Sequence, residues 1–160
     1  MRDWRKNSLR DFLRRLLLIE EPPHRTALAF AVGVFFSFSP FWGLHTGLGL
    51  LVAFLFGFNR IAVLVGVWVN TPWTMPPAAS LGTALGLVLL GREVRFPSIP
   101  EVSIISREFW TTAATEFEFL LVPFFLGNIV FSLAVAVVAY FILRWILVKN
   151  QKRRSPSEPA

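Results

Sequence analysis

Polar side chains gather around two prolines inside an otherwise uncharged stretch, and these residues are the ones that could do chemistry. A proline removes a backbone donor and ends one helix, and a new helix can begin just after it. The free N–H groups at such a helix start attract anions such as phosphate or carboxylate. The sequence therefore predicts a substrate-binding region for an anion at these two breaks. Its candidate residues are Ser39, Pro40, Gly43, His45 and Thr46 at the first break, and Asn70, Thr71, Pro72 and Thr74 at the second.

Each of these side chains also has a purely structural interpretation. His45 could bind a proton or an anionic head group, or it could form a hydrogen bond between two helices. The threonines and asparagines could cap backbone groups that the breaks set free. Asn59 and Arg60 stand together at a predicted turn, so we expect them to be structural, with Arg60 an anchor at the membrane surface rather than a substrate contact.

The sequence contains no enzyme signature, so we expect no catalytic residues. Paired acid–base chemistry at the breaks is excluded because no carboxylate occurs between Thr26 and Gly91. The chain has no cysteine and only two histidines, so neither a metal site nor a cofactor is predicted. The acidic residues of segment 92–118 are typical of a solvated helix face.

The surroundings of the breaks indicate a lipid bilayer. From Thr26 to Gly91 the chain carries one formal charge, Arg60, and a second uncharged run extends from Phe119 to Leu143. The mean hydropathy is +0.58, which is high for an ordinary globular domain. We therefore expect an all-α membrane protein of broken or re-entrant helices and transmembrane helices, flanked by interfacial amphipathic helices.

Charge placement predicts the topology. Residues 1–25 hold seven basic side chains and the tail from Arg144 holds five, whereas segment 92–118 holds three basic and five acidic ones. Basic flanks favour the cytoplasmic side, so both termini are expected inside. Anionic lipid head groups are the expected partners of the basic ends, and nucleic acid is not.

Apolar runs, prolines and charges divide the chain into three regions. A helix crosses the hydrocarbon core in about 20 residues, so the uncharged run 26–58, interrupted at Pro40, is predicted to fold back as a hairpin. An alternative has three broken spans and places the basic tail outside. The predicted regions are a basic cytoplasmic segment 1–25 with an amphipathic helix at about 8–20, a membrane domain 26–148 and a disordered basic tail 149–160. The membrane domain comprises a re-entrant hairpin 26–58, a broken span 61–90, an external amphipathic segment 92–118 and a span 119–148.

The order of the two breaks resembles a bacterial membrane family known as domain of unknown function 2062. The shared elements are a glycine in the first apolar run, Pro-x-x-Gly-x-x-Thr, an asparagine before the next helix, and Asn-x-Pro-x-Thr. Here they are Gly33, then Pro40, Gly43 and Thr46, then Asn59, then Asn70, Pro72 and Thr74. The resemblance implies a bacterial inner-membrane protein with no settled activity, and glutamine is common in that family at position 45. Some relatives are joined to glycosyltransferase domains, which implies a role in the cell envelope.

Two functions fit the sequence. The first is transport or flipping of an anionic or lipid-phosphate substrate, by a homodimer, because the chain is too small to enclose a cavity alone. Gly82-x-x-x-Gly86 is a weak helix dimerisation motif. The alternative is a non-catalytic membrane scaffold that docks an envelope enzyme of the glycosyltransferase type.

Overall fold

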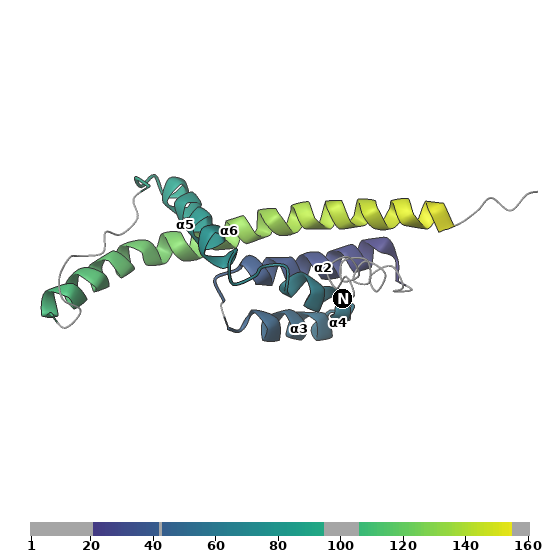
Figure 1. The fold of residues 1–160 in the computed structure, drawn as a ribbon, viewed down its shortest axis with the longest axis horizontal. Coiled ribbons are helices and arrows are strands. Elements are labelled where there is room, and N and C mark those ends of the chain that lie inside the picture. Colours follow the sequence, from purple (N-terminus) through teal and green to yellow (C-terminus); the bar gives the residue numbers. More distant parts are fainter. Residues whose placement is uncertain (1–20, 42, 95–105, 155–160) are drawn as a thin grey trace, which may run out of the picture.

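The computed structural model describes residues 21–41, 43–94 and 106–154 (Figure 1), and these residues form helices joined by turns, with no strand among them. The helices are α2 (Pro23–Phe38), α3 (His45–Leu55), α4 (Arg60–Val67), α5 (Met75–Leu89) and α6 (Arg107–Arg154). The predicted all-helical class is confirmed. The predicted amphipathic helix at about 8–20 lies outside the described residues.

Helices α2, α3 and α4 fold back on one another beside α6 (Figure 1). Helix α2 ends at Phe38, immediately before Ser39 and Pro40, and α3 returns from His45. The side chain of Arg25, in the first turn of α2, donates from Nη2 to the carbonyl oxygen of Gly57 at 3.3 Å. The turn after α3 therefore lies next to the start of α2, as a helical hairpin over 26–58 requires.

Asn59 and Arg60 occupy the start of α4, as predicted for structural residues. The Asn59 Oδ1 accepts hydrogen bonds from the backbone N–H groups of Ile61 at 3.0 Å and Ala62 at 3.2 Å, which makes Asn59 an N-cap. The Arg60 guanidinium carbon lies 5.7 Å from the centre of the Phe54 ring on α3. Both side chains therefore act at the end of the α3–α4 turn, away from the two breaks.

Glycines let two pairs of helices approach closely. Gly33 of α2 faces Gly66 of α4, so that a Cβ on Gly66 would collide with the backbone carbonyl of Phe30. Gly86 of α5 meets the backbone of Pro123 in α6 in the same way. Small residues at such crossings are typical of membrane helix pairs.

The expected use of Gly82-x-x-x-Gly86 as a dimerisation motif is wrong. Gly82 and Gly86 lie against Gly127 and Asn128 of α6 within the same chain, so this face is already occupied. The sequence spacing indicated a close helix contact correctly but could not say which helix supplies the other side.

Helix α6 includes parts of two segments that were predicted from the sequence to be separate. It has 48 residues, and the external segment 92–118 and the span 119–148 meet within it without interruption. The predicted boundary followed a change in charge, and a change in charge does not end a helix. The helix also continues through the first residues of the expected disordered tail, to Arg154, while 155–160 lie outside the described residues.

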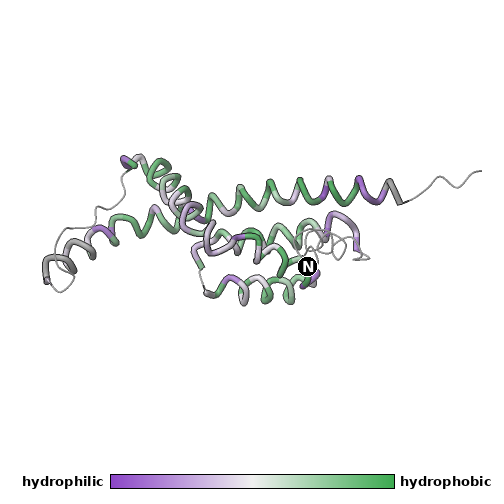
Figure 2. Tube along the Cα trace, in the orientation of Figure 1, coloured by the Kyte–Doolittle hydropathy of each residue, from purple (hydrophilic) through white to green (hydrophobic). Residues whose placement is uncertain are grey.

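Most of α6 is apolar and exposed. Of the helices that the structure describes, only α6 is long and apolar enough to cross a membrane by itself, over Ala114–Gln151. Figure 2 shows its hydrophobic middle and its hydrophilic C-terminal end. Leu133, Val138 and Phe141 each expose more than half of their side-chain surface. This exposure favours a membrane-spanning helix over the core helix of a water-soluble domain.

Pro123 in α6 cannot donate to the helix carbonyl before it, and Arg92 binds that carbonyl. A proline within a helix cannot donate to the carbonyl four residues earlier, which here belongs to Phe119. The Arg92 Nη1 donates to that oxygen at 2.8 Å, and its guanidinium carbon lies 4.9 Å from the centre of the Phe119 ring. Arg92, which follows α5, therefore binds α6 at the point where Pro123 interrupts the helix hydrogen bonds.

Replacing Arg92 with alanine is expected to lower the free energy of unfolding by about 1–2 kcal/mol, because the freed carbonyl loses a charged donor and the ring loses a cation. Arg92→Lys should recover part of that loss, since lysine keeps the charge but not the planar fork. Denaturant unfolding in detergent micelles measures the difference. Arg60→Ala is the matched control, because Arg60 has a ring contact and no comparable carbonyl bond. If Arg92→Ala and Arg60→Ala lowered the free energy of unfolding equally, the bond from Arg92 to the Phe119 carbonyl would contribute nothing to stability, and this prediction would be wrong.

Candidate functional site

The two breaks meet in the structure. The backbone N–H of Asn70 donates to Ser37 Oγ at 3.0 Å, and the Asn70 Nδ2 donates to the Ser37 carbonyl at 3.0 Å. Ser39 Oγ donates to the Phe36 carbonyl at 2.8 Å. The last carbonyl groups of a helix have no partner within it, and here Ser39 and Asn70 supply two of the missing donors. The second break therefore caps the helix that ends at the first.

The polar side chains of the second break are bonded to one another. Thr74 Oγ1 lies 2.6 Å from Asn70 Oδ1, and it accepts from the backbone N–H of Thr71 at 2.9 Å. The Thr71 and Thr74 hydroxyl oxygens are 3.1 Å apart. Pro72 lies inside this turn and is exposed. The contacts favour the capping interpretation of Asn70, Thr71 and Thr74.

The two helices that follow the breaks differ in the donors they offer. In α3 the first backbone bond runs from Leu48 to Leu44 at 2.8 Å, and Leu44 has no side-chain cap, so the N–H groups of residues 45–47 have no acceptor within the helix. In α5 the N–H of Met75 already donates to Thr71 at 3.0 Å, and the next two residues are Pro76 and Pro77. The expected anion-binding start of α5 is therefore wrong, because prolines have no N–H. At the start of α3 no such proline removes the donors, and the anion site there stays a prediction.

His45 opens α3 with an unused ring nitrogen. Among the residues that the structure describes, its Nδ1 is buried and has no hydrogen-bond partner. Gly43 has a φ of 85°, a left-handed conformation that suits glycine, and turns the chain toward α3. Thr46 is half-buried in the same first turn. A buried nitrogen atom without a partner is uncommon in proteins and marks the start of α3 as a place for a ligand or a water molecule.

A cavity of about 650 Å³ lies between α5 and α6 and extends to the first break. Pro40 of that break lines it together with Pro76, which lies in the first turn of α5, just after the second break. Its two hydroxyls are engaged by their own helix, since Ser80 donates to the Pro76 carbonyl at 2.9 Å and Thr83 to the Ala79 carbonyl at 2.7 Å. The walls are otherwise apolar, so the cavity suits a hydrocarbon chain. The other lining residues are Ala79, Phe117, Leu120, Leu121, Phe124 and Phe125.

The sequence did not identify two polar residues that organise this region. Ser37, 1% exposed, receives the bonds from Asn70, and Asn128, 2% exposed, lies where α6 crosses α5. Asn128 Nδ2 donates to the Phe124 carbonyl at 2.8 Å and lies 3.5 Å from Thr83 Oγ1. A buried amide in an apolar run is a signal for such a role. No cluster of three side chains suited to a metal ion occurs within 21–41, 43–94 and 106–154.

Comparison with known proteins identifies the family of the chain. Neither the curated proteins nor the solved structures contain a match to it. The model of one protein family, described as an uncharacterized protein conserved in bacteria (DUF2062), matches residues 6–155. The match includes both breaks, the cavity and all five described helices, and the chain therefore belongs to this bacterial family.

Proposed function

We propose that the protein is embedded in the bacterial inner membrane with both termini in the cytoplasm. The exposed apolar surface of α6 supports this placement, as do Arg144 and Lys149 at its C-terminal end. Helices α2 and α3, with 16 and 11 residues, are about 24 and 17 Å long, less than the hydrocarbon core of about 30 Å. Their hairpin then enters the bilayer and returns to the same side. Helices α4 and α5 together make one broken crossing.

Within that membrane, we propose that the protein binds an anionic, lipid-linked substrate and moves it across the bilayer. One observation carries the proposal: Pro40 of the first break and Pro76, in the first turn of α5 just after the second break, line a single apolar cavity. Non-helical backbone at membrane depth must be buried in protein or must line a cavity. Paired broken helices around such a cavity are the arrangement in which transporters hold substrates.

The two parts of the substrate bind at different places, the anionic group at the start of α3 and the apolar tail in the cavity. A phosphate or similar group binds the free N–H groups of α3 beside His45 and Thr46, and a hydrocarbon tail lies along α5 and α6. A helix start contributes about 0.3–2 kcal/mol to binding an anion. Such a weak site suits a carrier, which must release what it binds. Asn70 and Thr74 hold the breaks together and do not bind the substrate directly.

Flipping of a fluorescent lipid phosphate in liposomes tests this function, with quenching of the outer leaflet as the readout. His45→Ala is expected to slow flipping about tenfold, the effect of losing roughly 1.4 kcal/mol of binding in the transition state. His45→Gln is the matched control, because glutamine keeps an uncharged hydrogen-bonding group, and it should retain most of the rate. Equal rates in the alanine variant, the glutamine variant and the parent, with the three equally stable in detergent, would end the proposal.

A scaffold that docks an envelope glycosyltransferase-type enzyme is the second candidate. Apolar side chains on α6 that line no described cavity favour it, among them Val138 and Ile142, exposed by 57% and 55%. A scaffold should co-purify with one partner in fixed proportion after crosslinking in cells. A homodimer would instead yield crosslinks between two copies of this chain, and a carrier that works alone would yield neither.

A further inference from the structure

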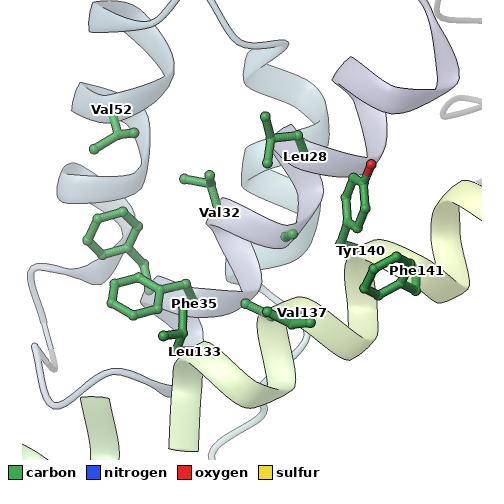
Figure 3. A pocket seen from close by; sticks show the side chains of 11 residues that line it. Leu28, Val32, Phe35, Val52, Leu133, Val137, Tyr140 and Phe141 are labelled. Atoms are coloured by element: carbon green, nitrogen blue, oxygen red, sulfur yellow. The ribbon is translucent and has the colours of Figure 1, made fainter. Parts of the chain in front are cut away.

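A second groove runs along α2, from Leu28 in its first half to Phe36 near the first break. Its volume is about 600 Å³, and it lies between α2 and the C-terminal half of α6, with Val52 of α3 at its side (Figure 3). Val32 and Phe35 line it from α2, and Leu133 and Val137 from α6. On each helix the lining residues recur over about eight positions, or about 12 Å. The groove is therefore a straight apolar channel parallel to two helices.

One end of this groove is polar and basic. Tyr140, which lines it, is hydrogen-bonded through its hydroxyl to His24 Nδ1 at 2.7 Å. Arg25 follows His24, and Arg144 lies one helical turn beyond Tyr140, with all three charged or titratable side chains exposed. Arg25 donates through Nη2 to Gly57, which leaves its other nitrogens for a ligand. The one described acidic residue nearby in sequence is Glu21.

We propose that this groove binds one anionic phospholipid, with an acyl chain along α2 and α6 and the phosphate at Arg25, Arg144 and the His24–Tyr140 pair. Apolar walls ending at basic groups match the two parts of such a lipid, and they match its charge. The inference rests on the membrane location proposed above but not on transport. Lipid retention without flipping leaves it intact and counts only against the transport proposal.

Charge also favours a lipid over a second copy of the chain in this groove. Two copies inserted in the same orientation pair about an axis along the membrane normal, so each brings the same end to the interface. Arg25 and Arg144 of one copy would then approach those of the other, and like charges repel. A phosphate between these side chains removes the repulsion instead.

The test measures lipid that stays with the purified chain. The full chain is reconstituted with equal amounts of phosphatidylglycerol and phosphatidylcholine, transferred into detergent and analysed by native mass spectrometry. We expect one retained phosphatidylglycerol per chain. Val137→Trp fills the groove and should reduce retention about tenfold. Val138→Trp is the control, since Val138 is the next residue, is similarly exposed and does not line the groove.

The head-group contacts are tested separately. Arg25→Gln with Arg144→Gln should abolish the preference for phosphatidylglycerol, at about fivefold for each charge removed. Equal retention in the Val137→Trp and Val138→Trp variants would overturn the proposal, as would retention with no head-group preference in the parent chain. A photocrosslinker at position 137 should label lipid, and labelling of a second copy of the chain instead would also refute it.

Discussion

Gly66→Ala is expected to lower the free energy of unfolding by about 3 kcal/mol. The new methyl group would collide with the Phe30 carbonyl and with the backbone of Val34, both in α2. Backbone atoms within a helix cannot rotate away as the tip of a side chain can, so α2 and α4 must separate. The separation would also weaken the hydrogen bonds between Ser37 and Asn70, because Ser37 lies in the last turn of α2 and Asn70 follows the end of α4.

Gly47→Ala is the control for this prediction. Gly47 lies in α3, and a Cβ there would meet nothing within 4 Å. Alanine favours a helix over glycine by about 0.5–1 kcal/mol, so this variant should be slightly more stable than the parent. Denaturant unfolding of both variants in the same detergent should therefore give shifts of opposite sign. Destabilisation of both variants would mean that the tight crossing is not the cause.

Asn70→Ala should reduce stability by about 2–3 kcal/mol and should also abolish flipping. The change removes the donor to the Ser37 carbonyl and the acceptor for Thr74, and the buried Ser37 carbonyl loses this partner. Asn70→Asp keeps the acceptor but places an acceptor against the Ser37 carbonyl, so it should be no more stable than the alanine variant. Hydrogen exchange at Thr71 and Met75 would report the opening of the turn.

Asn59→Ala provides the comparison, because Asn59 caps α4 through two backbone bonds, and within the described residues neither bond involves the breaks. Its loss should cost about 1 kcal/mol, typical of an N-cap, and should leave flipping close to the parental rate. If the two asparagine variants reduced flipping equally, general destabilisation would explain the result and the breaks would have no special role.

The sequence predicted the helix ends at both breaks because proline acts locally. The geometry at Pro40 and Pro72 depends on a few neighbouring residues, and α2, α3 and α5 end or begin within a few residues of the predicted positions. The same local chemistry explains the cap at Asn59. What proline could not reveal is the distance between the breaks, which depends on the bonds from Asn70 to a serine in another helix.

Two other predictions failed, and for different reasons. The spacing of Gly82 and Gly86 indicated a close crossing, but Gly127 and Pro123 of the same chain complete it instead of a second copy. The absence of donors at the start of α5 followed from Pro76 and Pro77, which were visible in the sequence. The prediction failed there because a helix start was treated as a source of N–H groups without regard to the residues that form it.

The helices of this protein differ greatly in length, and a bilayer must accommodate all of them. The uncharged run of α6, Phe119–Leu143, has 25 residues, about 38 Å, whereas α2 and α5 are about 24 and 22 Å long. Hydrophobic mismatch of this kind is relieved by tilting the long helix and thinning the lipid around the short ones. In the proposed topology, the hydrocarbon layer next to the broken crossing of α4 and α5 is then narrower than in the surrounding membrane. A head group there has a shorter distance to cross between leaflets, whichever residues bind it.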